Sequence, residues 1–393
     1  MILIFGIYIS CSGPERDNKG KTVFRYNEAA GITSLDPAFA KNLANIWACN
    51  QLFNGLVQLD NNLKVIPCIA NEWKISGDGL TYTFHLRNDI YFHDHPLFND
   101  QKGRKVVAGD FVYSFNRILD PVVASPGAWV FQNVELRDRQ YGFFAPDDST
   151  VIIRLAKPFP PFLGILSMQY CSVIPREVVE YYGKDFRQNP VGTGPFYFKM
   201  WKEGVKLVCR RNNHYFEKDL MGNPLPYLEA VSITFLMDKQ SAFLEFVKGN
   251  LDFMSGLDAS YKDELLTKDG KLHPKYQDKF QLITEPYLNT EYLGILVDTG
   301  SELVRKSPLR FRSVRKAINY GFDREKMIRY LRNNIGIPGN YGIVPSGMPS
   351  FDSNFVRGYS YNPDKARHLL ASAGFQNGNN LPDITLATTS EYL

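Results

Sequence analysis

Hydrophobic and polar positions alternate at several places in the first 240 residues, a period that predicts β-strands with one buried face. The clearest case is the segment 80–86, where Tyr82, Phe84 and Leu86 fall on one face. It follows Ser76-Gly77-Asp78-Gly79, a turn sequence, so we expect a β-hairpin here. The same alternation predicts strands over residues 23–26, 151–155 and 231–235.

Other segments carry apolar residues at helical spacing. Residues 41–53 predict a helix, and beyond residue 238 the pattern becomes mostly helical. Asp238 is placed to cap one helix, and Asn362-Pro363-Asp364 predicts the start of another. Residues 381–385 then predict a final strand. This mixture of strands and helices indicates an α/β protein.

Composition describes an ordinary globular chain. Its 393 residues are enough for two or three domains, with 44% hydrophobic and 22% charged residues. Aromatic residues reach 14%, which suits a protein with a sizeable cleft, although large cores also use aromatics. The net charge of +4 is weak and basic residues are scattered among acidic ones, so we expect no nucleic-acid partner.

The N-terminus resembles an export signal. Met1 to Ile9 is apolar but too short to span a bilayer, and small residues follow at Ser10-Cys11-Ser12-Gly13. A cysteine in this place resembles a lipobox, which implies a lipid anchor on Cys11, with residues 1–21 as signal and tether. No Lys or Arg precedes the apolar run, and a cysteine that falls by chance in a hydrophobic strand is the alternative.

Four further cysteines offer no motif. None forms a Cys-x-x-Cys pair or has zinc-finger spacing. Disulfides remain open in an exported protein, but buried free thiols are the favoured interpretation. The four are Cys49, Cys68, Cys171 and Cys209.

Signals for catalysis or metal binding are weak. Gly192-Thr193-Gly194 lacks the Lys-Ser/Thr of a phosphate loop and predicts a turn. His93-Asp94-His95 has no third ligand nearby, so a polar loop is favoured over a metal site. Glu285 and Glu291 could form the carboxylate pair of a hydrolase, which is the alternative from another functional class. We expect no catalytic residue, no metal and no cofactor.

Ordered motifs along most of the chain carry a family resemblance. Residues 71–87 (NEWKISGDGLTYTFHLR), followed by Phe92-His93-Asp94, resemble the signature of extracellular solute-binding proteins of the oligopeptide and dipeptide type. Further matching segments are residues 34–37, 52–56, 108–114, 191–196, 312–320 and 361–366.

The resemblance implies a two-lobed, periplasmic-binding-protein-like α/β fold (type II, cluster C). Residues 22–48 and 165–238 would form the first lobe, and residues 49–164 a subdomain inserted into it. Residues 239–393 would begin the second lobe. Relatives continue beyond the position of Leu393, so we expect this second lobe to be incomplete.

The same resemblance implies a function in transport. It implies a monomer at the cell envelope that captures short peptides between its lobes and delivers them to an ABC permease in the membrane. A nickel complex, an oligosaccharide or an opine are the alternative ligands within the family.

Five residues match regions that contact ligand in relatives, where an extended segment pairs its main chain with the peptide. Three of them have a structural alternative: a solvated charge for the lysine, a core contact for the leucine and packing on Phe131 for the tryptophan. The five candidates are Lys41, Asn42, Leu43, Trp129 and Tyr292.

Overall fold

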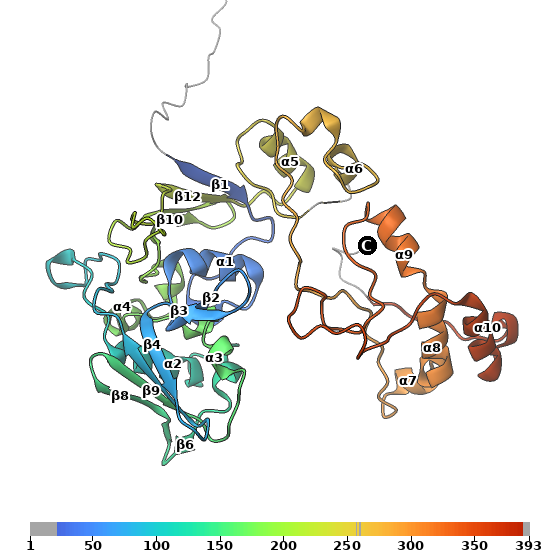
Figure 1. Cartoon of the computed structure of the whole chain (residues 1–393), viewed down its shortest axis with the longest axis horizontal. Helices are drawn as coiled ribbons and strands as arrows, with labels where there is room; N and C mark the ends of the chain where they lie inside the picture. Colours follow the sequence, from blue (N-terminus) through green and yellow to red (C-terminus); the bar gives the residue numbers. More distant parts are fainter. Residues whose placement is uncertain (1–21, 257, 259–260, 388–393) are drawn as a thin grey trace, which may run out of the picture. The chain divides into compact units, whose positions relative to one another are not determined.

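The computed structural model describes residues 22–256, 258 and 261–387, and these divide into two compact units (Figure 1). Unit 1 ends at Gly256 and unit 2 contains the residues after it. Cys11 and the rest of the expected signal and tether lie outside the described residues.

Unit 1 contains a mixed four-stranded sheet in the order β1-β12-β11-β10. β1 and β12 are parallel neighbours, and the other pairs are antiparallel. Its strands are β1 (Val23–Asn27), β10 (Phe196–Lys202), β11 (Lys206–Arg211) and β12 (Ala230–Thr234). β12 is buried on both faces, Ser232 included, where alternation predicted one polar face. A central strand of an α/β unit has both faces covered, so its polar positions are buried too.

A second, antiparallel sheet in unit 1 has the order β4-β5-β9-β8. Its strands are β4 (Ala70–Ile75), β5 (Thr81–Leu86), β8 (Phe143–Asp147) and β9 (Thr150–Arg154). The predicted hairpin is confirmed: β4 and β5 pair across the turn, where Gly79 has φ +71°. Tyr82, Phe84 and Leu86 are buried as the alternation predicts. Helix α2 (Ala108–Leu119) packs against β8 and β9.

Short hairpins and helices complete unit 1. The predicted helix after residue 41 is confirmed as α1, which packs against β10. The remaining elements are the hairpins β2 (Val57–Leu59) with β3 (Val65–Pro67) and β6 (Leu136–Arg137) with β7 (Gln140–Tyr141), and helices α1 (Leu43–Leu52), α3 (Phe162–Ile165), α4 (Arg176–Tyr182) and α5 (Lys239–Val247).

One contiguous hydrophobic core runs through unit 1, from Ile32 to Phe235. Its largest fully buried side chains include Phe84, Phe111 and Phe115. A core shared by both sheets makes residues 32–235 a single packed body, because buried apolar side chains supply most of the stabilising free energy.

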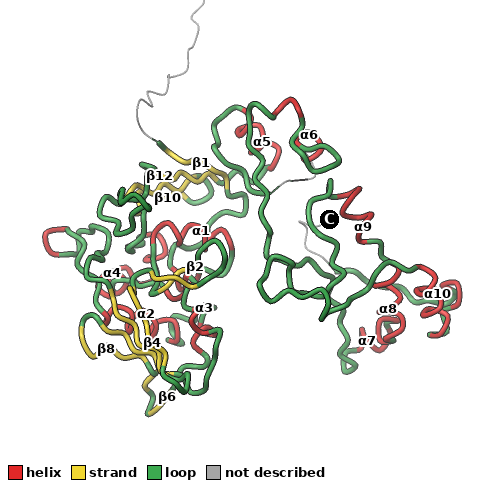
Figure 2. Tube along the Cα trace, viewed as in Figure 1, coloured by secondary structure: helices red, strands yellow, loops and turns green. Residues whose placement is uncertain are grey.

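Unit 2 is built from helices and loops (Figure 2). Its helices are α6 (Lys262–Leu265), α7 (Glu302–Lys306), α8 (Arg312–Gly321), α9 (Arg324–Lys326) and α10 (Pro363–Ser372), with a π-helix over Met327–Leu331 after α9.

The predicted helix caps are confirmed in both units. At α5 the Asp238 side chain accepts the Ser241 N–H, and at α10 the Asn362 side chain accepts the Lys365 N–H.

The predicted strand at residues 381–385 is wrong. No strand is present among the described residues of unit 2, and Ile384 is 43% exposed. A single extended segment is not a strand until another segment accepts its backbone hydrogen bonds. Large apolar side chains are also exposed along residues 282–297, including Ile283 and Leu293.

The two units divide later in the chain than the expected boundary between lobes at residue 238. The Asp252 N–H donates to the Arg25 carbonyl, and Phe253 forms a bridge with Tyr26 of β1. These contacts keep α5 and the segment after it with unit 1, because the segment lies along the edge of β1. The assignment of ranges to lobes and an inserted subdomain stays a prediction.

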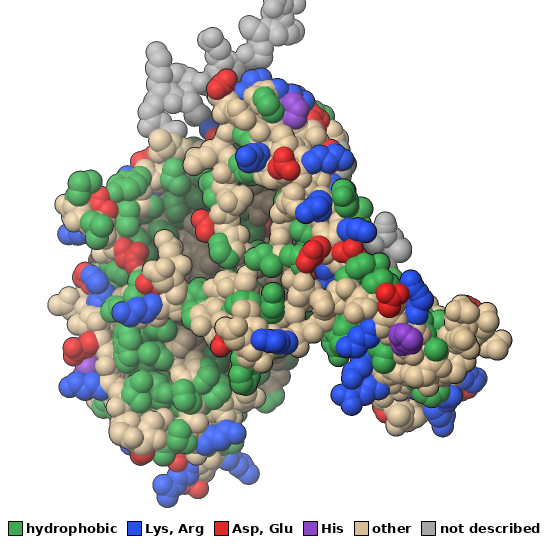
Figure 3. Space-filling view, turned by 45° about the vertical axis from the view of Figure 1, so that its right-hand side comes forward, with side chains coloured by type: hydrophobic (Ala, Val, Ile, Leu, Met, Phe, Trp, Pro, Cys, Tyr) green, Lys and Arg blue, Asp and Glu red, His purple; other side chains and the backbone are tan. Residues whose placement is uncertain are grey.

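Charge is distributed unevenly within unit 2. Six basic residues and no acidic ones occur between Leu303 and Phe322. Blue side chains gather over this part of the molecule at the lower right of Figure 3. The scattered distribution inferred from the whole chain therefore does not hold along α7 and α8.

Candidate functional site

The Ser34–Pro37 turn that leads to the predicted ligand segment is fixed by a buried ion pair. Arg117 of α2 binds Asp36 with both terminal nitrogens, at 3.0 and 2.6 Å. The Asp36 side chain is 4% exposed and also accepts the Ala38 N–H. A bidentate pair of this kind sets direction as well as distance, so it fixes the path of the chain into residues 38–43.

Residues Lys41, Asn42 and Leu43 form the entry to α1. The side chain of Asn42 caps the helix by accepting the Asn45 N–H at 2.9 Å, and its carbonyl accepts the Ile46 N–H. Its backbone is extended (φ −120°, ψ 160°), which is the conformation that pairing with a peptide strand requires. Lys41 is exposed and Leu43 is 46% exposed, so the alternative of Leu43 as a core contact does not hold.

Trp129 lies on a short 3-10 turn, Ala128–Phe131, and is 47% exposed. Ser125 ties this segment to the turn before α1: its hydroxyl donates to the Ala38 carbonyl at 2.6 Å and accepts the Gly127 N–H. The fold thereby brings the Trp129 segment alongside the approach to Lys41, although 87 positions separate Ser125 from Ala38.

Tyr292 lies in unit 2, in a segment without helix or strand, and is 72% exposed. Thr290 donates to the Ile343 carbonyl, and Arg332 binds the neighbouring Glu291 carboxylate with two nitrogens. The segment is therefore held at the two positions that precede Tyr292. Glu291, one of the two acids of the hydrolase alternative, is engaged in this ion pair.

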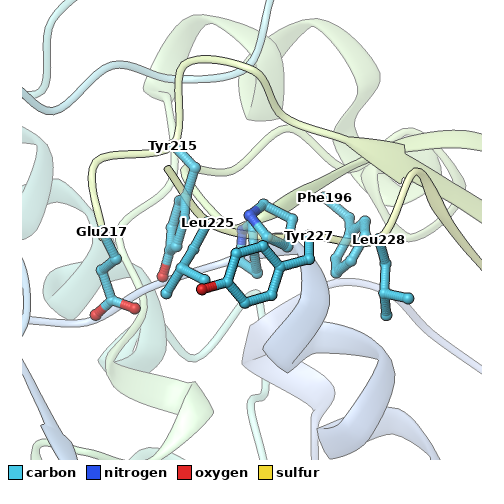
Figure 4. A pocket seen from close by; sticks show the side chains of 8 residues that line it. Phe196, Tyr215, Glu217, Leu225, Tyr227 and Leu228 are labelled. Atoms are coloured by element: carbon cyan, nitrogen blue, oxygen red, sulfur yellow. The ribbon is translucent and has the colours of Figure 1, made fainter. Parts of the chain in front are cut away.

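Unit 1 also has a hollow that none of the five predicted residues lines. Its volume is about 360 Å³, and its wall is largely apolar (Figure 4). The lining residues are Pro195, Phe196, Tyr215, Glu217, Leu225, Pro226, Tyr227 and Leu228.

The polar groups of this hollow lie toward one end. Figure 4 shows the hydroxyls of Tyr215 and Tyr227 and the Glu217 carboxylate on the side away from Phe196 and Leu228. Burial, followed by the nearby Glu217 charge, raises the pKa of Tyr215 well above its ordinary value, so its hydroxyl stays protonated. Gln58 donates to Glu217 at 2.7 Å. The arrangement suits an apolar group that ends in a hydrogen-bond donor.

A second hollow of about 500 Å³ shares Glu217 and is more polar. Arg87 forms two 3.0 Å hydrogen bonds with Asp89 and lies over the Phe216 ring, 5.1 Å from its centre. Lys218 completes the lining. Sequence reasoning missed both hollows. The available signal was the run of aromatics and prolines from Tyr215 to Leu228, which has no periodicity.

His93 has a structural role. Its Nδ1 accepts the Gly192 N–H and its Nε2 donates to the Gly194 carbonyl at 3.0 Å. Burial lowers the pKa of His93 to about 4, so the ring is neutral at physiological pH. Among the residues that the structure describes, no three His, Cys, Asp or Glu side chains are grouped as metal ligands.

The glycines of the 192–194 turn are required by close packing. A Cβ at position 192 would lie 2.0 Å from the Leu52 carbonyl oxygen, and the Gly194 N–H donates to that same oxygen. The sequence predicts a turn here, and the structure shows that the turn packs on the end of α1.

Cys49, Cys68, Cys171 and Cys209 are all buried, and their thiols are free. Burial raises the pKa of Cys68 and of Cys209 to about 12, so both remain thiols at neutral pH. Across the part of the chain that the structure describes, no helix is both long and apolar enough to cross a membrane.

Solved structures with the same fold cover more than nine-tenths of this chain. The DppA periplasmic binding protein of Helicobacter pylori in complex with peptide STSA is 24% identical, with a TM-score of 0.68 over 91% of this chain and 67% of that one. NikZ of Campylobacter jejuni in complex with Ni(L-His) is 25% identical, with a TM-score of 0.69 over 92% and 64%. The fold is therefore that of the two-lobed periplasmic binding proteins of type II, cluster C.

Residues 64–392 match the family model described as bacterial extracellular solute-binding proteins, family 5 Middle. The chain belongs to this family. It is 27% identical over 339 residues to the dipeptide-binding protein of Escherichia coli K12, covering 83% of this chain and 58% of that protein. It is also 27% identical over 381 residues to heme-binding protein A of Haemophilus influenzae, covering 94% and 65%. The chain thus spans about three-fifths of the length of these relatives.

Proposed function

We propose that this protein is the substrate-binding component of an ABC-type importer of short peptides. It acts outside the cytoplasm as a monomer held at the membrane by a lipid on Cys11, and it passes its ligand to a permease. It works by binding and release, and performs no catalysis.

The match of residues 64–392 to the solute-binding family carries this proposal. Support for peptides comes from the dipeptide-binding relative and from the STSA complex. Main-chain hydrogen bonds suit such a ligand, because every peptide offers them and each adds about 0.5–1.5 kcal/mol net. A ligand favours closure of two lobes only as far as it binds the closed state more tightly.

The ligand contacts that we propose in unit 1 are Lys41, Asn42, Leu43 and Trp129. The Ser125–Ala38 hydrogen bond brings their two segments together, and Leu43 and Trp129 expose apolar surface there. Tyr292, exposed on unit 2, is the contact that we propose from the second lobe.

Another small solute is the second candidate. Relatives and structural neighbours with other ligands include heme-binding protein A, the Ni(L-His) complex of NikZ and the mannopinic acid complex of MoaA from Agrobacterium tumefaciens. The fold alone therefore does not choose the ligand.

Native mass spectrometry tests the ligand class directly. The protein purified from its own membranes without added ligand should carry a heterogeneous set of short peptides. If the protein carries a single metal chelate, heme or opine instead, that solute is the ligand and the peptide proposal is wrong. Turnover of a glycoside would overturn the proposed binding function altogether.

Substitutions test the proposed contacts. Trp129→Ala and Tyr292→Ala should each weaken binding of the co-purified peptides about tenfold, the effect of losing roughly 1.4 kcal/mol of contact. Val122→Ala and Tyr181→Ala are matched controls, because these side chains are also exposed, at 91% and 67%. Equal affinities for all four variants, measured by calorimetry, would remove Trp129 and Tyr292 from the site.

A further inference from the structure

The loop between β11 and β12 forms a hydrogen-bonded tip in unit 1. Lys218 and Pro224 form an antiparallel bridge, and the Leu225 N–H donates to the Glu217 carbonyl. The Asp219 N–H donates to the Asn223 carbonyl and closes the turn. The end of the loop, residues 219–223, is therefore held by a short ladder.

Asp219 fixes the tip from inside. Its carboxylate accepts the N–H groups of Met221 and Asn223, the Asn223 side-chain amide and the Tyr227 hydroxyl. These donors, with Tyr227 first, lower the pKa of Asp219 to about 2. The charge of Asp219 is thus directed into the loop and compensated there.

The same geometry turns two large apolar side chains outward. Leu220 is fully exposed and Met221 is 83% exposed. Single exposed apolar residues are common, but two adjacent ones on a fixed turn form a protrusion that can enter an apolar phase. Lys218, two positions before Leu220, is also exposed, and its charge suits the phosphate of a lipid headgroup.

The tip lies at the end of the sheet where the described chain begins. The Glu229 N–H donates to the Thr22 carbonyl at 2.8 Å, and the Thr22 hydroxyl donates to the Tyr227 carbonyl. Because β1 and β12 are parallel, both start at this end, as the blue and olive strands in Figure 1 show. Tyr227 therefore contacts both Thr22 and, through its hydroxyl, the Asp219 that holds the tip.

The length of chain before Thr22 limits how far this end can be from a lipid on Cys11. Eleven residues span at most about 40 Å when fully extended. An anchor at Cys11 consequently keeps the start of β1 within about 40 Å of the lipid, so the tip beside it can reach the bilayer surface.

We propose that the Leu220–Met221 tip is a membrane contact that inserts into the bilayer interface beside the lipid anchor. It orients unit 1 on the membrane, because an anchor at a single point limits the distance to the membrane but sets no orientation. The partner that the tip contacts is the lipid bilayer itself. This inference rests on the anchoring at Cys11 proposed above.

A fluorescent label on the tip tests the contact. The acylated full chain is placed in phosphatidylethanolamine and phosphatidylglycerol vesicles, with an environment-sensitive dye on Met221→Cys. Met237→Cys is the matched control, because Met237 is also 83% exposed but follows the other end of β12. The dye reaches the new thiol selectively, since the four described cysteines are buried and acylation blocks Cys11.

The expected result is a blue shift and quenching by brominated lipid at position 221, with neither effect at position 237. Identical emission at both positions in acylated protein would overturn the tip contact and leave peptide binding and anchoring intact. A shift that requires membranes containing the permease would overturn it too, because the occupant would then be protein.

The mass of the N-terminal peptide reports acylation separately. A peptide without the lipid would remove the proposed anchor. The tip is then tested in Cys11→Ser, Met221→Cys protein, where the dye reaches position 221 alone: a blue shift would support the tip contact, and its absence would overturn it.

Discussion

His93 shows at the residue scale how burial changes the chemistry of a motif. In isolation His93-Asp94-His95 is a candidate metal site, but the His93 ring is fully used in joining its loop to the Gly192–Gly194 turn. A neutral imidazole can accept with one nitrogen and donate with the other, whereas a protonated ring can only donate. Protonation would therefore break the hydrogen bond from Gly192 and place a charge in the core.

The stability of unit 1 should consequently depend on pH in the acid range. The pKa of His93 is lowered to about 4 in the folded protein, from 6.5 in the unfolded chain. The contribution of the neutral His93 ring to the free energy of unfolding is complete above pH 6.5. It is lost as pH falls toward 4, because the unfolded chain takes up the proton at a higher pH than the folded protein. The free energy of unfolding should fall by about 3 kcal/mol over this interval.

Urea unfolding at several pH values measures this effect. His93→Gln should be less stable at pH 7 and show a flatter pH profile than the parent. His95→Gln is the control, because His95 is only half-buried and burial lowers its pKa less far. A parent profile that is flat between pH 6.5 and 4 would contradict the assignment of a neutral, buried His93.

At the scale of elements, α1 shows that folding constrains a residue that we also propose as a ligand contact. Asn42 caps the helix with its side chain and keeps its own backbone extended. The cap satisfies the Asn45 N–H, which has no partner within the helix. Position 42 is therefore constrained by the helix whatever ligand lies beside it.

Two substitutions separate these roles. Asn42→Ala should lower the free energy of unfolding by about 1 kcal/mol, because the cap is lost. Asn42→Asp should keep the cap and most of the stability. Thermal unfolding measures both, and peptide affinity is measured at a temperature where both variants are folded. Equal stability of Asn42→Ala and the parent would contradict the cap.

At the scale of the whole molecule, the hydrophobic core is concentrated in unit 1. All the buried residues of the main cluster lie between Ile32 and Phe235, whereas unit 2 exposes many large apolar side chains. A contiguous core is the main condition for a segment to fold by itself. The described part of unit 1 satisfies it.

Residues 22–256 expressed alone should therefore unfold in one cooperative thermal transition. Phe84→Ala should lower its stability by about 3–5 kcal/mol, because Phe84 is fully buried in the core of unit 1 and its deletion leaves a cavity. Calorimetry measures both proteins. A broad, non-cooperative transition in residues 22–256 would show that unit 1 needs the rest of the chain.

The sequence predicted features that depend on neighbouring residues better than features that depend on residues far apart in the chain. The hairpin, the alternation at Tyr82 and Phe84, and the caps at Asp238 and Asn362 are confirmed, because each depends on neighbours a few positions away. Residues 381–385 had the composition of a strand but no partner in the described chain. Whether the five predicted ligand contacts are correct stays untested.

The sequence by itself determined where many strands and helices begin, and its ordered motifs determined the family. Only the tertiary structure decided which distant groups meet: Arg117 on Asp36, Ser125 on Ala38, and Tyr227 between Thr22 and Asp219. Turn, cap and strand preferences act over a few neighbouring residues, so they can be recognised from the order of residues in the sequence. Contacts between residues far apart in the sequence depend on how the hydrophobic core packs. The pattern of residues along the chain does not specify that packing.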